Sequence, residues 1–348
     1  MNAHEGDRLA LMLSRAGFER AQSQNVADVL IFQTCSIRDT AARKVLMHIS
    51  QAKKFRQKNK LRQKICVIGC LSATEKIDGV DIVLGTNKLE DLVEMLTLST
   101  PEQNFGVGNS VIIMNGCENF CAYCIVPYAR GKEISRPLDD IVQEFGYILG
   151  QNRGGSGSSE IAQKGCDNGT RNAPIYLLGQ NVNSYKCPKT GANFVELLDK
   201  ICALDGDFIV NFLSSHPKDF TQSLVDCIAR NPKIERNIHL PLQSGCNKTL
   251  ARMNRKYTIE QYLEKIASLR NAVSEVHITT DIICGFPGET EEDFAETVAV
   301  MQRVKFNAAF IFPYSRRRGT SADKMDGHLD KKTIMARTTQ LIELQRKI

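Results

Sequence analysis

The sequence lacks the features that would assign it to a membrane or to the secretory route. No apolar run in its 348 residues is long enough to span a bilayer. The opening Met-Asn-Ala-His-Glu-Gly-Asp has neither the basic nor the apolar segment of a signal peptide. Strong charge of one sign is also missing, and the formal net charge of +6 only weakly indicates an acidic partner. We therefore expect a cytoplasmic protein without a membrane partner.

Cysteine, in contrast, is abundant. Twelve cysteines without a secretory signal indicate a reducing compartment, where thiolates serve as metal ligands more often than as disulfides. Cys117, Cys121 and Cys124 have the spacing C-x3-C-x2-C, whereas a zinc site or a four-cysteine cluster needs a fourth ligand. Three thiolates on a cubic iron–sulfur cluster would leave one iron open to another ligand. A structural zinc loop or three unrelated core cysteines are the alternatives.

Apolar segments of strand length alternate with helical patterns along most of the chain, which predicts a parallel α/β architecture. The second half has six strand–helix units, as a partial (β/α)6 TIM-like barrel requires. The first half predicts a smaller Rossmann-like domain with a parallel sheet. The predicted strands cover residues 27–33, 64–69, 80–84, 111–114, 174–178, 207–213, 237–241, 277–283 and 308–313; the predicted helices begin near 39 and 88 and cover 194–203, 219–230, 258–272 and 290–304.

These segments also set the expected domain boundaries. Residues 1–98 form the first domain, 99–109 a linker and 110–320 the barrel. Residues 321–348 form a C-terminal helical segment. The polar, glycine- and serine-rich stretch 150–173 is predicted to be a disordered insertion in the barrel without a catalytic role.

Polar and thiol side chains follow the predicted strands at their carboxyl ends, the edge at which parallel sheets and barrels bind ligands. Some free cysteines are ordinary core residues, as we expect of Cys66, Cys202 and Cys227. The loop that begins at Gly285 is expected to offer free N–H groups to a ligand, because it leaves a strand and opens a helix. We expect no proton transfer by His216 or His239. The strand-end candidates are Cys35, Cys70, Gln180, Asn181, Gln243, Ser244, Gly285, Pro287, Gly288 and Glu289.

Taken in order, these motifs resemble the radical SAM methylthiotransferases, and most closely their MiaB-type tRNA branch. Tyr123, directly before the last cysteine of the triplet, completes the pattern of radical S-adenosylmethionine (SAM) enzymes. The other runs that carry the resemblance are Gln33-Thr-Cys35-Ser-Ile-Arg38, Gly69-Cys70-Leu71, Leu177-Leu-Gly-Gln180-Asn181-Val-Asn183-Ser-Tyr185, Ser215-His216-Pro217, Leu240-Pro-Leu-Gln243-Ser-Gly245, Met253-Asn-Arg255-Lys-Tyr257-Thr258 and Gly285-Phe-Pro-Gly-Glu-Thr290.

The resemblance implies two [4Fe-4S] clusters and SAM as cofactors. Cys117, Cys121 and Cys124 would hold the cluster that binds SAM, with Tyr123, Gln180, Asn181, Gln243, Ser244 and the Gly285–Glu289 loop around it. Cys35 and Cys70 would be two of three ligands to an auxiliary cluster. The implied reaction adds a methylthio group to C2 of N6-isopentenyladenosine at tRNA position 37. The implied partners are that tRNA, an electron donor of the flavodoxin or ferredoxin type and a sulfur donor, with the chain working as a monomer.

The chain departs from the family pattern at both ends. The third auxiliary ligand belongs to a Gly-Cys-Gln-Met-Asn segment, of which Met1-Asn2 match the last two residues. Either the sequence starts at an internal methionine or the protein lacks that ligand. The family's C-terminal TRAM domain, which helps to bind RNA, would follow the helix that ends at Ile348.

Other functions remain open at this stage. A family relative could act on threonylcarbamoyladenosine in tRNA or on an aspartate of a ribosomal protein. A degenerate protein that binds RNA or metal without transferring sulfur is the non-enzymatic alternative. The basic runs at 53–62 and 316–318 fit contacts with nucleic acid, and the first fits equally well the solvated end of a helix.

Overall fold

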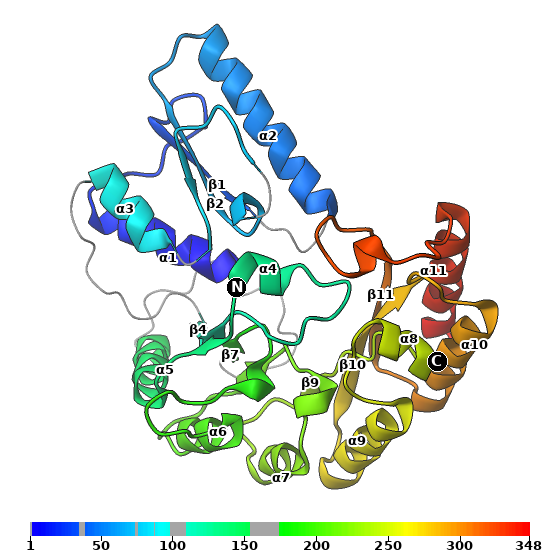
Figure 1. The fold of residues 1–348 in the computed structure, drawn as a ribbon. Helices are drawn as coiled ribbons and strands as arrows, with labels where there is room; N and C mark the ends of the chain where they lie inside the picture. Colours follow the sequence, from blue (N-terminus) through cyan, green and yellow to red (C-terminus); the bar gives the residue numbers. More distant parts are fainter. Residues whose placement is uncertain (1, 35–38, 74–75, 87, 98–108, 154–173) are drawn as a thin grey trace. The chain divides into compact units, whose positions relative to one another are not determined.

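The computed structural model describes residues 2–34, 39–73, 76–86, 88–97, 109–153 and 174–348 (Figure 1). The chain forms two compact units, which are described separately. Unit 1 contains Met1–Gly108, Gly116–Glu118 and Cys124–Lys132, and unit 2 contains Asn109–Asn115, Asn119–Tyr123 and Glu133–Ile348. The described part of the chain has no helix that is long and apolar enough to cross a membrane.

Unit 1 is built on a parallel sheet with the strand order β1-β2-β3. The strands are β1 (Val29–Thr34), β2 (Lys64–Gly69) and β3 (Ile82–Leu84). The central strand β2 is buried at every position after Lys64, because helices cover both faces of the sheet. Register pairs Thr34 with Gly69, so the chain leaves β1 and β2 at the same edge.

The helices of unit 1 cover the two faces of that sheet. Helix α1 (Asn2–Arg15) packs against α3 (Leu89–Thr97), and α2 (Asp39–Lys58) lies on the other side of the sheet in Figure 1. A short helix, α4 (Val126–Arg130), and a 3₁₀ turn, Leu71–Ala73, complete the unit. The core between α1, α3 and the sheet consists of Leu9, Met12, Cys66, Ile68, Ile82, Leu89, Leu92 and Val93.

In the described part of unit 2, six parallel strands form two sheets of three. One sheet has the order β4-β7-β8, with β4 (Ser110–Ile112), β7 (Ile175–Leu178) and β8 (Val210–Phe212). The other has the order β11-β10-β9, with β9 (Asn237–His239), β10 (His277–Cys284) and β11 (Ala308–Pro313). A parallel bridge between Val210 and Ile234 links the first sheet to the segment that enters β9.

The strands therefore follow one another in chain order, as in a (β/α) barrel that remains open. Within the described residues, β4 and β11 are not paired with each other. A separate antiparallel pair is formed by β5 (Met114–Asn115) and β6 (Ile134–Ser135). The helices of unit 2 are α5 (Leu138–Arg153), α6 (Phe194–Cys202), α7 (Gln222–Arg230), α8 (Asn247–Arg252), α9 (Ile259–Ala272), α10 (Glu291–Val304) and α11 (Lys331–Gln345).

Local sequence explains where several of these helices begin. Asn193, Thr258 and Thr290 each close a capping box with the side chain three residues on, which satisfies two N–H groups at the start of α6, α9 and α10. The inward faces of these helices join the strands in one large apolar core that includes Phe145, Phe194 and Tyr262.

The mixed α/β class with parallel sheets is confirmed, and each predicted strand is present with shifts of a few residues at its ends. One boundary was wrong: α5 continues to Arg153, so residues 150–153 are helical rather than part of an insertion. Residues 154–173 lie outside the described residues. The expectation of core cysteines is confirmed for Cys66 and Cys227, which are buried, whereas Cys202 is partly buried and packs against the core. Burial raises the pKa of all three thiols.

Candidate active site

The loop that carries the cysteine triplet begins at a glycine that no other residue can replace without movement of the backbone. Gly116 has φ +78°, and a Cβ atom there would lie 1.9 Å from the carbonyl oxygen of Lys132. Next to it, the N–H of Cys117 donates to the carbonyl of Gly131 at 3.2 Å. The Cys117 side chain is buried, and Cys124 is partly exposed.

The middle of the same loop is bound to the turn after α8, within unit 2. The N–H of Ala122 donates to the carbonyl of Met253 at 2.9 Å. The side-chain amide of Asn254 donates to the carbonyl of Phe120 at 2.8 Å. These bonds fix the main chain on both sides of Cys121, which is buried.

Arg255 extends this anchorage to the thiol itself. Its Nη1 donates to Cys121 Sγ at 3.4 Å and to the Tyr123 hydroxyl at 3.4 Å. Its Nη2 donates to the carbonyl of Pro241 at 3.2 Å, and its Nε to the Tyr257 hydroxyl at 3.3 Å. The guanidinium is buried, and burial lowers its pKa, but interactions with Tyr123, Tyr257 and Cys121 outweigh this effect and raise it.

The network continues from Arg255 to the ends of two strands. The Tyr257 hydroxyl donates to the carbonyl of Leu242 at 2.6 Å, in the segment that follows β9. The ring of Tyr257 meets that of His216 edge to face, with 5.9 Å between centroids. The N–H of His216 donates to Asn183 Oδ1 at 3.0 Å. Residues after β7, β8 and β9 are thereby brought together with Cys121, as expected for the carboxyl edge of parallel strands.

His216 is held neutral at this edge. Burial, with the nearby charges of Arg255 and Lys218, lowers its pKa to about 2. Its Nδ1 accepts the N–H of Lys218 at 3.2 Å, so in the neutral ring the proton lies on Nε2. This arrangement agrees with the structural role expected from the sequence.

Three buried polar atoms at the ends of β7 and β8 have no hydrogen-bond partner among the described residues. They are Asn181 Oδ1, Asn183 Nδ2 and Ser215 Oγ. Each such atom costs roughly 1–3 kcal/mol unless a ligand or water satisfies it. Asn181 has its amide group engaged with Asp219 at 2.7 Å, which leaves its oxygen free to accept. Donors and acceptors that are prearranged in this way fit a polar ligand such as SAM.

The loop Gly285–Glu289 is organised differently from what the sequence predicted. Glu289 Oε2 accepts the N–H groups of Gly285 at 2.5 Å and Phe286 at 3.0 Å. The N–H of Gly288 donates to the carbonyl of Gly327 at 2.8 Å. The expectation of free N–H donors is therefore wrong at these positions, because the buried Glu289 carboxylate satisfies the turn from within. What the turn can offer a ligand is its shape.

Gln243 and Ser244 are buried beside this loop. Gln243 takes φ +69°, which is unusual for a residue other than glycine, while its N–H and C=O both bond to β10. The hydroxyl of Ser244 accepts the N–H of Cys246 at 3.2 Å and lies 3.4 Å from the Thr297 hydroxyl. Ser244 is thus committed to internal bonds, whereas the strained backbone at Gln243 is of the kind that gathers at functional sites.

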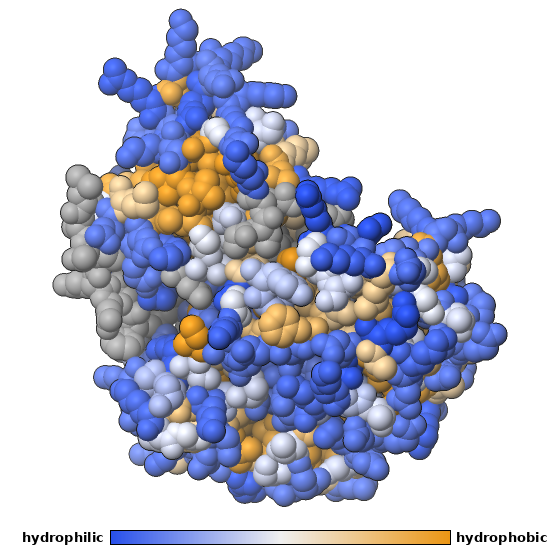
Figure 2. All heavy atoms as spheres, in the orientation of Figure 1, coloured by the Kyte–Doolittle hydropathy of each residue, from blue (hydrophilic) through white to orange (hydrophobic). Residues whose placement is uncertain are grey.

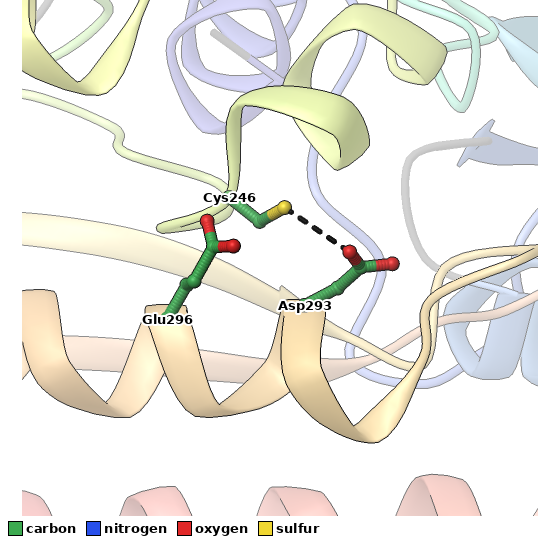
Figure 3. Close-up of side chains that lie close together, drawn as sticks. All are labelled: Cys246, Asp293 and Glu296. Atoms are coloured by element: carbon green, nitrogen blue, oxygen red, sulfur yellow. Dashed lines mark hydrogen bonds between the residues drawn. The ribbon is translucent and has the colours of Figure 1, made fainter.

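Three side chains close to this segment are of types that bind metal ions, but two of them are already engaged in hydrogen bonds and an ion pair. Cys246, Asp293 and Glu296 bring their ligand atoms within 4.8 Å of one another (Figure 3). The Cys246 thiol donates to Asp293 at 3.3 Å, and burial raises its pKa. Asp293 also accepts from Lys248 Nζ at 3.0 Å and from the N–H of Thr290 at 3.0 Å. The lysine supplies the positive charge that a metal would bring.

In unit 1, Cys70 occupies a buried position directly after β2. Its N–H donates to the carbonyl of Thr34 at 3.3 Å, and Gly69 before it has φ +105°. The buried guanidinium of Arg130 contacts the Cys70 thiol and forms an ion pair with Glu5 at 3.1 Å. Cys35, the other predicted auxiliary ligand, lies outside the described residues.

The sequence placed Ser215, with Ser214 and His216, among the polar residues that follow a strand at the ligand-binding edge, without a role of its own. Arg255, Asn183 and Arg130 were not singled out as site residues. The first two stand inside the quoted runs, and their position in these runs was the available signal. Arg130 had none, because only the folded chain brings it to Cys70.

Comparisons with known proteins identify the family. The radical SAM superfamily model matches residues 111–301, and the model described as uncharacterized protein family UPF0004 matches residues 1–85. Relatives from Thermodesulfovibrio yellowstonii and Thermoanaerobacter pseudethanolicus, both named tRNA-2-methylthio-N(6)-dimethylallyladenosine synthase, are 39% identical to this chain. The alignments cover 100% of this chain and 81% and 76% of those proteins.

The chain belongs to the radical SAM methylthiotransferase family. It is an enzyme of a superfamily that uses SAM and an iron–sulfur cluster, which confirms these cofactor expectations. Solved structures show the fold alone. The radical SAM methyltransferase TsrM from Kitasatospora setae superposes with a TM-score of 0.61 at 13% identity, over 91% of this chain and 68% of that one. The cobalamin-dependent radical enzyme OxsB gives a TM-score of 0.54 at 13% identity, over 92% of this chain and 48% of that one.

Proposed function

We propose that this enzyme adds a methylthio group to C2 of N6-isopentenyladenosine at position 37 of tRNA. The observation that carries the proposal is the extent of the similarity. Relatives named for this reaction are 39% identical over 100% of the chain, so the similarity includes both family models and the segment between them.

The cysteine triplet supports the chemistry. Cys117, Cys121 and Cys124 would hold a [4Fe-4S] cluster, and the buried cation of Arg255 beside Cys121 suits a negatively charged group there. When bound, the cluster and SAM supply the radical chemistry that an unactivated C–H bond requires. The chain's own task is to position these groups and to keep water away.

Residues at the carboxyl edge of the strands are proposed to surround SAM. Asn181 Oδ1, Asn183 Nδ2 and Ser215 Oγ offer the unsatisfied hydrogen-bonding atoms. The turn at Gly285–Glu289 would form a wall, since its internal bonds make it rigid. The remaining proposed contacts are Tyr123, Gln180 and Gln243. Ser244 is proposed to line the site through its backbone, because its hydroxyl is engaged with Cys246 and Thr297.

Cys70, together with Cys35, is proposed to bind the auxiliary cluster that supplies sulfur. The Arg130 guanidinium at Cys70 would compensate the negative charge of an iron-bound thiolate. An electron donor of the flavodoxin or ferredoxin type and a sulfur donor are the further partners that this reaction needs. The proposed substrate sets the cytoplasm as the compartment, and we propose that the chain acts as a monomer.

Helix α2 is the proposed contact with tRNA. Residues 43–64, which contain most of α2 and the turn after it, have nine lysines and arginines and no acidic residue. Lys54, Lys58 and Arg62 are exposed. In Figure 2 hydrophilic side chains cover the upper end of unit 1, where α2 ends, and a hydrophobic area lies below them. A dense row of cations without acidic neighbours suits a phosphate backbone.

The test uses tRNA that carries isopentenyladenosine without the methylthio group. The reconstituted full chain is incubated anaerobically with this tRNA, SAM, sulfide and a reductant, and nucleosides are analysed by mass spectrometry. The 2-methylthio derivative should form, and the Cys117/Cys121/Cys124→Ala variant should form none. Product only on threonylcarbamoyladenosine or on a ribosomal protein would assign another substrate. A chain that holds iron and binds tRNA but transfers no sulfur would contradict the proposal.

A further inference from the structure

Arg255 is a buried cation whose hydrogen-bond partners among the described residues include no carboxylate. Arg255 is only 8% exposed. Burial of a cation costs folding free energy unless an anion compensates its charge. Among the described residues, no carboxylate forms an ion pair or hydrogen bond with Arg255. Its partners are a thiol, two phenols and a carbonyl oxygen.

Other buried arginines in the described structure solve the same problem with carboxylates. Arg130 is paired with Glu5, and Arg337 with Glu289 and Glu291. Arg255 thus differs from them in the nature of its partners. The exception calls for an anion that is added after folding.

Of the groups in contact with Arg255, the Cys121 sulfur is the one that becomes anionic when it binds a metal. Phenols ionise near pH 10, and burial raises the pKa of Tyr257 further. A thiolate that binds metal is deprotonated, and the distance from Nη1 to Sγ, 3.4 Å, is already that of an N–H···S hydrogen bond. The missing counter-charge therefore belongs at Cys121.

We propose that Arg255 is the charge partner of the Cys121 thiolate and a positioning residue that tunes the reduction potential of the cluster bound by the triplet. Hydrogen bonds to cluster sulfurs and nearby charge are among the factors that set such potentials. The one-electron reduced cluster carries one more negative charge than the oxidised cluster. A buried cation stabilises the reduced form more, so Arg255 makes reduction by a low-potential donor easier. This inference rests on the proposed function only in that the triplet holds a cluster.

The hydrogen-bonding geometry supports tuning over simple packing. Arg255 is held on two further sides, by Tyr257 and by the carbonyl of Pro241, so its fork cannot swing away from Cys121. Tyr257 is fixed in turn by the carbonyl of Leu242. Rigid orientation is what gives a charge a constant effect on a nearby centre.

The test is an anaerobic dithionite titration of the reconstituted full chain, monitored by electron paramagnetic resonance. The signal that changes on addition of SAM belongs to the cluster that binds it. Arg255→Gln should make reduction of this cluster at least tenfold less favourable, which is a shift of about 59 mV to more negative potential. Arg255→Lys, which keeps the charge but not the fork, should shift the potential by less. Arg136→Gln removes an arginine of unit 2 that is paired with Glu144 and should leave the potential unchanged.

The variants with lysine and glutamine separate the possible results. Unchanged potentials in folded, iron-loaded Arg255→Gln and Arg255→Lys would overturn the inference. An equal shift in Arg136→Gln would do so as well, because it would show a general effect of destabilisation. If Arg255→Gln folds but holds no iron, Arg255→Lys decides: a shift to more negative potential supports the inference, and an unchanged potential overturns it. If the glutamine variant does not fold, a smaller negative shift in the lysine variant supports the inference and an unchanged potential overturns it.

The same titration keeps this inference apart from the proposed function. A parent chain whose signal responds to SAM, but which forms no methylthio product, would end the proposed reaction and leave the role of Arg255 testable. If the parent chain is fully active and the arginine variants have the parent's reduction potential, the inference about Arg255 is wrong and the proposed function stands.

Discussion

At the scale of single residues, the cysteine loop depends on Gly116. Its positive φ costs an L-residue roughly 1–3 kcal/mol, and a Cβ atom 1.9 Å from the Lys132 carbonyl oxygen would force the backbone apart. Gly116→Ala should therefore lower the iron bound by the triplet and the free energy of unfolding. Gly131→Ala is the matched control, because Gly131 has φ +74° but open space at its Cβ position. Equal iron content in the two variants would show that the close approach does not matter.

His216 provides a second prediction at this scale, through its pKa of about 2 in the folded protein. An unfolded histidine has a pKa near 6.5, so between these values the unfolded chain binds more protons than the folded one. The free energy of unfolding should hence fall as the pH decreases below about 6.5, by at most about 1.4 kcal/mol per pH unit from this group.

Urea unfolding at pH 7.5, 6.5 and 5.5 measures this dependence. His216→Gln should flatten the profile in that range. His277→Gln, which removes an exposed histidine of unit 2, should keep the slope of the parent. A slope that is the same in the parent and in His216→Gln would refute the assignment of the acid sensitivity to His216.

How far individual site residues could be foreseen depended on whether local sequence marks them. Cys117, Cys121 and Cys124 are marked by their spacing, because C-x3-C-x2-C can be recognised in the sequence without knowledge of the fold. Arg255 has no such mark: its significance comes from Cys121, which is distant in sequence and close in space. At Glu289, nothing in the local sequence indicated that its carboxylate accepts the amides of its own turn. The prediction of free N–H groups in that turn was wrong for this reason.

At the scale of elements, α2 should carry a measurable share of tRNA affinity. Two of its cations have structural bonds, Lys53 to the carbonyl of Asp78 and Arg56 to Asp81, but Lys54, Lys58 and Arg62 are exposed. Changing these three to glutamine should weaken tRNA binding. The dependence of log K on log salt should become shallower by roughly 0.7–0.9 for each phosphate that is no longer neutralised by a side chain.

The control for α2 removes three exposed lysines from unit 2, namely Lys331, Lys332 and Lys347. Filter binding or fluorescence anisotropy at several salt concentrations compares the two triple variants. If both weaken binding equally, net charge rather than α2 attracts the tRNA, and the assignment of the helix as an RNA contact fails.

Elements with a strong periodic pattern were foreseen, and those stabilised by context were not. The buried strands β2 and β10 and the capped helices α6, α9 and α10 agree with the predictions within a few residues. Helices α1, α4, α5 and α8 were missed. Helix α4 has only five residues, and the end of α5 runs into a polar, glycine-rich stretch that reads as a loop, so both depend on contacts distant in sequence.

At the scale of the whole molecule, the two proposed cluster sites fall in the ranges of the two family models, with the triplet in residues 111–301 and Cys35 and Cys70 in residues 1–85. The triplet is complete within the described residues, whereas Cys70 is the one predicted auxiliary ligand that they contain. The contact of Arg130 with the Cys70 thiol in unit 1 resembles that of Arg255 with Cys121 in unit 2. A buried cation at each sulfur would compensate the negative charge of an iron-bound thiolate, so both sites should bind iron in the full chain.

Iron and acid-labile sulfide, measured per chain after anaerobic reconstitution, decide between one cluster and two. A cubic cluster contributes about four irons, so the full chain should hold about eight. The Cys117/Cys121/Cys124→Ala variant and the Cys70→Ala variant should each hold about four, and only the second should keep the signal that responds to SAM. About four irons in the parent and in Cys70→Ala, with none in the triplet variant, would mean that the chain holds one cluster, bound by the triplet. Sulfur transfer would then need a source outside this chain, because a single cluster that binds SAM has no second site from which sulfur can be given up.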